Sequence, residues 1–165
     1  MSRLYFHADE ILSMAQQIER NGASFYRKAS EIASLSEIRQ RLLGLAAMED
    51  EHEKIFAAME GRLSEKEREA AASRDPDAAL YVRSWADAHV FDVNADPAQR
   101  LTGVETKADI LRMALEMEKD SIAFYVGVRA LVPEGWGQER LDAIIKEEMR
   151  HIVDLRGELS SLNLT

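Results

Sequence analysis

The sequence predicts an all-α protein, a four-helix bundle of two antiparallel helix hairpins joined by a long crossover that contains a short helix. Three observations lead to this prediction. Four long segments place apolar residues three and four apart, as an amphipathic helix requires. Only three prolines and eight glycines interrupt the 165 residues, of which 46% are hydrophobic. The second half also repeats the residue pattern of the first half, which indicates two copies of one hairpin.

The first hairpin is expected at residues 7–61. Its first helix covers about residues 7–33, where the apolar residues form one stripe at helical spacing. Ser36 is the expected N-cap of the second helix, because a serine hydroxyl accepts a bond from backbone N–H groups that lack a partner in the first turn. The second helix then runs to about Gly61. The short connection between the two helices predicts that they lie antiparallel.

The second hairpin is expected at residues 107–162. Its helices cover residues 107–131 and 138–162, and both carry an apolar stripe. Between them lie Pro133 and two glycines, which end the first of these helices and favour a turn. The second hairpin therefore has the same order of elements as the first.

The crossover between the hairpins is expected at residues 62–106. Its first part is polar, and residues 77–91 have the pattern of a shorter helix. The sequence Asn94–Pro97 favours a turn. A connection of this length can run along a whole bundle, so the chain is expected to form a single domain over residues 1–165.

Composition excludes several classes of function. The formal net charge is −9 and no basic stripe stands out, which argues against binding to nucleic acid. No apolar run approaches the ~20 residues of a membrane helix, so no membrane association is expected. The first residues lack the continuous apolar core of a signal peptide, and we expect a cytoplasmic protein. Cysteine is absent, so any metal site must use histidine and carboxylate ligands.

The internal repeat is found by shifting the sequence by 99 residues, and it needs no gap. It matches polar residues as well as apolar ones. The matched pairs include Ile11 and Ile110, Glu19 and Glu118, Phe25 and Phe124, Tyr26 and Tyr125, Leu42 and Leu141, Glu49 and Glu148, and His52 and His151. The two hairpins are therefore expected to be related by an approximate two-fold axis.

The repeated polar residues lie on the faces that should point into the core. Glu19 lies within the apolar stripe of its helix, and Glu49 and His52 are three residues apart on one face of the next helix. Four buried carboxylates would repel one another and lose their hydration, whereas two divalent cations would neutralise them. One glutamate from each of two helices plus Glu-x-x-His from each of the other two is the ligand set of di-iron and di-manganese bundles. The predicted metal ligands are Glu19, Glu49, His52, Glu118, Glu148 and His151.

Two tyrosines share the faces of these glutamates. Tyr26 and Tyr125 each follow a predicted ligand by seven residues, and helical side chains lean toward the N-terminus. Each hydroxyl could therefore reach a ligand and orient it. The alternative is that both are ordinary core aromatics. The acidic neighbours Asp50, Glu51 and Glu147 are expected to face solvent.

The same residues resemble the rubrerythrin-like branch of the ferritin superfamily, and the resemblance covers both hairpins. It implies a ferritin-like bundle with a non-haem centre of two iron ions per chain, which cycles between ferrous and ferric states and reacts with hydrogen peroxide or dioxygen. Manganese and zinc also suit this ligand set. The resemblance makes Glu19 and Glu118 terminal ligands, Glu49 and Glu148 bridging ligands, and His52 and His151 the caps of one metal each.

The sequence departs from full rubrerythrins in two ways. It has no cysteine and therefore no rubredoxin module, so electrons would come from an external donor protein. The seventh carboxylate of some rubrerythrins is also missing from the third helix. We expect a homodimeric oxidoreductase whose catalytic set is the six ligands with Tyr26 and Tyr125. Two alternatives remain: a ferroxidase or iron-handling protein, and a non-catalytic bundle stabilised by zinc, which has no redox chemistry here.

Overall fold

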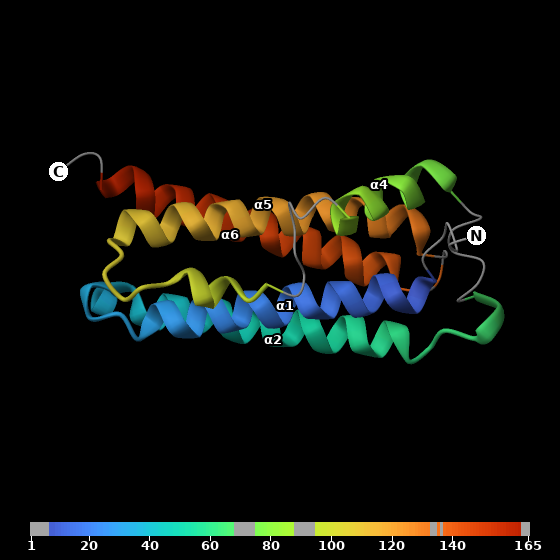
Figure 1. Cartoon of the computed structure of the whole chain (residues 1–165), viewed down its shortest axis with the longest axis horizontal. Helices are drawn as coiled ribbons and strands as arrows, with labels where there is room; N and C mark the ends of the chain where they lie inside the picture. Colours follow the sequence, from blue (N-terminus) through green and yellow to red (C-terminus); the bar gives the residue numbers. More distant parts are fainter. Residues whose placement is uncertain (1–6, 68–74, 88–94, 133–134, 136, 163–165) are drawn as a thin grey trace.

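The computed structural model describes residues 7–67, 75–87, 95–132, 135 and 137–162. Four long helices, paired as two hairpins, form the bundle (Figure 1). No strand occurs among the described residues, and the predicted all-α fold is confirmed. None of the described helices is long and apolar enough to cross a membrane. The long helices are α1 (Ala8–Ser30), α2 (Arg39–Glu60), α5 (Lys107–Leu131) and α6 (Gln138–Leu162).

The second hairpin begins and ends where the sequence predicts. α5 starts after Thr106, whose hydroxyl accepts a hydrogen bond from the backbone N–H of Asp109 at 3.2 Å. The Asp109 carboxylate accepts a bond from the backbone N–H of Thr106 at 3.0 Å. This reciprocal capping box supplies partners to two backbone groups that the helix itself leaves unpaired. Within the turn before α6, Gly135 and Gly137 have φ of 82° and 111°, a conformation that favours glycine.

The predicted start of the second helix is wrong. Ser36 is not its N-cap, because residues Ala33–Ile38 form a short 3₁₀ helix, η1, and α2 begins three residues later. A 3₁₀ helix has three residues per turn, so Ile32, Leu35 and Ile38 lie on one side, and all three are buried. Burial of these apolar side chains therefore outweighs the capping signal of a single serine.

The crossover is anchored on both hairpins. Its helix α4 (Pro76–Asp87) packs against α5, and its 3₁₀ helix η2 (Pro97–Arg100) packs against α1 (Figure 1). α4 approaches α5 closely at Gly127, where an added Cβ would lie 2.7 Å from the Tyr81 ring. The predicted end of the crossover helix, residues 88–91, lies outside the described residues.

A polar layer divides the apolar core into two clusters. The first cluster lies around the start of α1 and the end of α5, and the second around the end of α1 and the start of α5. Eight polar or charged side chains are buried among the described residues. Six of these eight are the predicted metal ligands. The bundle core is therefore apolar on both sides of one charged layer.

Candidate metal centre

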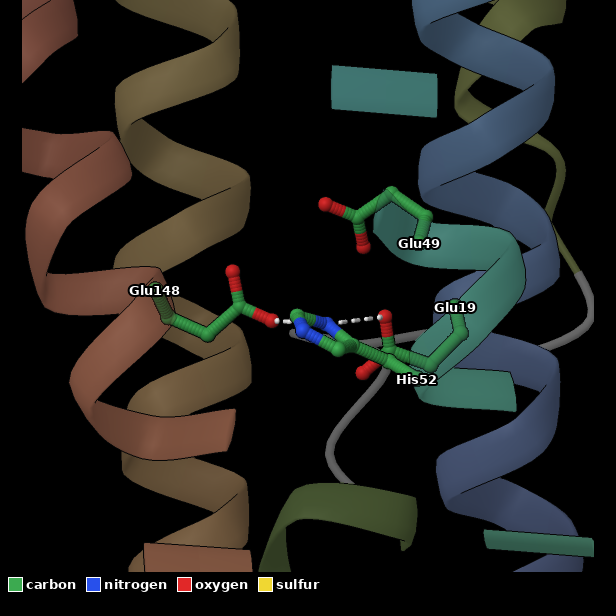
Figure 2. A group of neighbouring side chains, drawn as sticks. All are labelled: Glu19, Glu49, His52 and Glu148. Atoms are coloured by element: carbon green, nitrogen blue, oxygen red, sulfur yellow. Dashed lines mark ion pairs between the residues drawn. The ribbon is translucent and has the colours of Figure 1, made fainter. Parts of the chain in front are cut away.

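The six predicted ligands come from all four long helices and meet inside the bundle. They are buried at exposures between 0% and 4%. Their helices present them at one level, and Figure 2 shows four of them directed toward a common space from α1, α2 and α6. The six are Glu19 on α1, Glu49 and His52 on α2, Glu118 on α5, and Glu148 and His151 on α6.

The donor atoms form two overlapping groups. Glu19 and His52 complete one group, Glu118 and His151 complete the other, and both groups contain Glu49 and Glu148. Within each group the four ligand atoms lie within 4.8 Å of one another. Two sites that share two carboxylates are the arrangement of a dinuclear centre.

Most of these donor atoms have no hydrogen-bond partner. The unpaired atoms are Glu19 Oε2, Glu49 Oε1, both carboxylate oxygens of Glu148, and the Nδ1 atoms of His52 and His151. Close contacts exist, at 3.0 Å from His52 Nδ1 to Glu148 Oε1 and 2.8 Å from His151 Nδ1 to Glu148 Oε2, but without hydrogen-bond geometry. Buried polar atoms without partners are rare and costly. Convergent donors of this kind fit two metal ions, which would satisfy all of them together.

The histidines carry strongly perturbed pKa values. Burial alone would lower the pKa of His52, but the nearby carboxylates of Glu148 and Glu19 outweigh it and raise the pKa to about 11. In the same way, burial opposes but Glu118 and Glu148 raise the pKa of His151 to about 9. Without metal, both imidazoles are therefore protonated on both nitrogens and positively charged at neutral pH.

The carboxylates differ among themselves. Burial and the charges of neighbouring carboxylates raise the pKa of Glu49 well above its usual value. Burial also raises the pKa of Glu118, to about 8, although His151 opposes this shift. Glu148 lies between both imidazoles, which overcome its burial and lower its pKa to about 2. Protons thus neutralise the metal-free layer, and metal ions would replace them.

The two tyrosines reach across the bundle to the opposite hairpin. The Tyr26 hydroxyl donates to Glu118 Oε1, and the Tyr125 hydroxyl donates to Glu19 Oε1. Burial and the adjacent carboxylates raise the pKa of both tyrosines well above the usual 10, so both hydroxyls keep their protons. Each tyrosine therefore holds one of these two carboxylates in place, and the second oxygen of Glu19 lies 3.5 Å from His52 Nδ1 inside the centre.

Three further residues touch the centre without having been selected from the sequence. Glu147, expected to face solvent, lies 2.7 Å from His52 Nε2, and its side chain is 36% exposed. Met48 Sδ lies 3.4 Å from His151 Nε2. Gly22 leaves room for a ligand, since an added Cβ would lie 3.0 Å from Glu49 Oε2. A glycine within an apolar helix stripe was the one signal available, because it often marks a close approach.

A cavity of about 250 Å³ leads toward the centre between α1, α5 and η2. Its inner wall includes the buried side chains of Glu49 and Glu118, and its outer wall includes the exposed Arg100. Asp96 and Asp120 add two acidic groups along this wall. The cavity therefore gives small molecules or ions a route to the carboxylates.

The fold and the site together define a ferritin-like helical bundle with a centre of buried glutamate and histidine side chains. A crystal structure of a Thermotoga maritima protein, described as ferritin-like and diiron-carboxylate, superposes with a TM-score of 0.73. The two sequences are 28% identical, and the match covers 94% of this chain and 96% of that one. No curated protein matches the sequence.

The family itself follows from the sequence match. The model of the rubrerythrin family matches residues 10–159, which span both hairpins and the crossover. The chain belongs to the rubrerythrin family. The resemblance found in the repeated glutamate, tyrosine and histidine residues is thereby confirmed, and no rubredoxin module is evident.

Proposed function

We propose that the chain is a non-haem di-iron oxidoreductase that reduces hydrogen peroxide or dioxygen with electrons from an external donor protein. The observation that carries this proposal is the convergence of six buried donor atoms without hydrogen-bond partners. Such a layer is costly when empty and is satisfied by two cations. Membership of the rubrerythrin family and likeness to a diiron-carboxylate structure favour iron.

The proposed ligands divide between the two ions. Glu19 and His52 would hold one ion, Glu118 and His151 the other, and the remaining two carboxylates would bind both. Four carboxylates then balance two divalent charges, and the neutral imidazoles complete the set. Two ferrous ions bound by these residues would supply two electrons, which with two protons would convert one hydrogen peroxide molecule into two water molecules.

The chain itself prepares the site for a small oxidant. The hydrogen bonds of Tyr26 and Tyr125 hold two carboxylates in place before any substrate arrives. The two apolar clusters exclude water above and below the layer. The cavity reaches Glu49 and Glu118, and its volume is large enough to admit peroxide or dioxygen.

The proposal is tested by loading the protein with two ferrous ions per chain and mixing it with hydrogen peroxide. We expect one rapid oxidation of both ions, followed by turnover only when a reductant is added, because these 165 residues contain no cysteine to ligate an iron–sulfur relay. Stopped-flow absorbance measures the oxidation. Glu49→Gln should impair it, whereas Glu53→Gln, a surface change at an ion pair with Arg20, should not. Bound ferrous iron that neither peroxide nor dioxygen oxidises would refute the redox function.

A second candidate function, a ferroxidase, is favoured by the acidic wall of the cavity. Asp96 and Asp120 line the route to the centre, and carboxylates attract ferrous ions. A ferroxidase would oxidise successive iron ions and accumulate them, whereas the proposed oxidoreductase retains two per chain. Iron counting after repeated additions of ferrous iron and oxidant distinguishes the two. A bundle stabilised by zinc would instead contain zinc when purified from its native source.

A further inference from the structure

The two histidines of the centre differ in what holds their outer nitrogen atoms. His52 Nε2 lies 2.7 Å from a carboxylate oxygen of Glu147, on the opposite hairpin. His151 Nε2 lies 3.4 Å from the sulfur of Met48, also on the opposite hairpin. Both inner nitrogens, Nδ1, face the buried carboxylates. The two outer contacts therefore occupy matching positions, but one is made by a carboxylate and the other by a thioether.

This difference occurs at equivalent positions of the sequence repeat. Met48 and Glu147 are 99 residues apart, as are the two histidines that they contact. The hydrogen bonds from tyrosine to Glu19 and to Glu118 are present on both sides. The pair at positions 48 and 147 thus distinguishes two sides that are otherwise closely matched in their ligands and in the tyrosines that hold them.

The chemical consequence follows from the acceptor strength of the two groups. Once a metal ion replaces the Nδ1 proton, a carboxylate that accepts a strong hydrogen bond from the Nε2–H of His52 keeps the lone pair of Nδ1 directed inward and makes it a stronger donor. A thioether sulfur is a weak acceptor and holds the ring of His151 only loosely. The imidazole of His52 is therefore the better oriented and the stronger donor.

We propose that Glu147 is a positioning residue that makes the two metal positions unequal, so that the first divalent cation binds on the His52 side. This inference rests on the proposed metal centre. The His52 position is the tighter of the two, and Met48 leaves the His151 position weaker. Loss of such a contact to a ligating histidine typically lowers metal affinity by about 10–100-fold.

The order of binding can be measured with zinc, which needs no redox activity. Metal-free protein labelled with ¹⁵N-histidine is titrated with Zn²⁺, and the ring resonances are assigned with single histidine variants. We expect the His52 resonances to shift up to one equivalent and those of His151 to shift between one and two equivalents. Parallel shifts, or His151 first, would overturn the inference while leaving the metal centre intact. Absence of zinc binding would refute the centre and the inference together.

Exchanging the two residues tests the cause. Both side chains are more than a third exposed, so exchange leaves the buried core in place. Glu147→Met should weaken the first binding step by about 10–100-fold, and the double variant with Met48→Glu should bind zinc first at His151. Glu51→Gln removes a nearby surface charge that contacts Lys54 and controls for long-range electrostatics. An equal loss in Glu51→Gln, or unchanged order in the exchanged variant, would contradict a positioning role.

Discussion

Raising the pH should lower the free energy of unfolding of the metal-free protein. Acidic groups on a protein surface do not usually have this effect. The reason is the buried layer, where the folded state holds protons that the unfolded chain releases. The pKa of Glu118 is 4.5 in its ordinary state and about 8 in the fold. Between these values the folded protein binds close to one extra proton, so stability falls as pH rises. Glu49 shifts in the same direction.

The magnitude follows from the number of protons. One extra proton in the folded state costs about 1.4 kcal/mol for each pH unit, so Glu118 alone removes roughly 2–3 kcal/mol between pH 5 and pH 7. The pKa values of His52 and His151, raised from 6.5 to about 11 and about 9, add losses of the same sign above pH 6.5. Glu148 acts oppositely, but its stabilisation is lost only as pH falls from 4.5 toward 2.

Urea unfolding of chelator-treated protein at pH 5, 6, 7 and 8 measures this effect. Metal-loaded protein should behave differently, because the ions bind the deprotonated ligands and stabilise the fold more as pH rises. Glu118→Gln removes one titrating group and should flatten the pH dependence of the metal-free form between pH 5 and pH 7. A metal-free protein whose stability is constant or rises over this range would show that the layer is not charged as described.

Three other perturbations have defined outcomes. Glu49→Ala should reduce metal content at both positions, whereas His52→Ala should mainly empty one; elemental analysis showing equal losses would contradict the shared carboxylate. Tyr125→Phe leaves Glu19 without its buried donor and should cost about 1–3 kcal/mol in a thermal melt, unlike a mere packing aromatic, whose loss of a hydroxyl would cost nothing. Gly127→Ala should destabilise by about 1–3 kcal/mol because of its close approach to Tyr81, whereas Gly44→Ala, with open space around it, should stabilise by up to about 1 kcal/mol.

The positions of the long helices, and the side of each helix that is buried, were predictable because they depend on local periodicity. The bounds of α5 and α6 agree with the expected 107–131 and 138–162. Glu19 stood within an apolar stripe, so its burial followed from its position alone. The start of α2 was not predictable from Ser36, because tertiary burial of neighbouring apolar side chains decided it. A local capping signal does not decide where a helix begins when burial of neighbouring apolar side chains contributes several kilocalories per mole.

The sequence by itself determined the number of helices in the bundle, their core faces, and the set of polar residues that those faces carry inward. Only the tertiary structure decided which of these residues touch across the hairpins. Tyr26 and Glu118 are 92 positions apart, and His52 and Glu147 are 95 apart. Such contacts depend on how far one hairpin slides and rotates against the other, which close packing of the apolar clusters sets. Glu147 therefore looks like a surface acid in the sequence and becomes a partner of His52 in the fold.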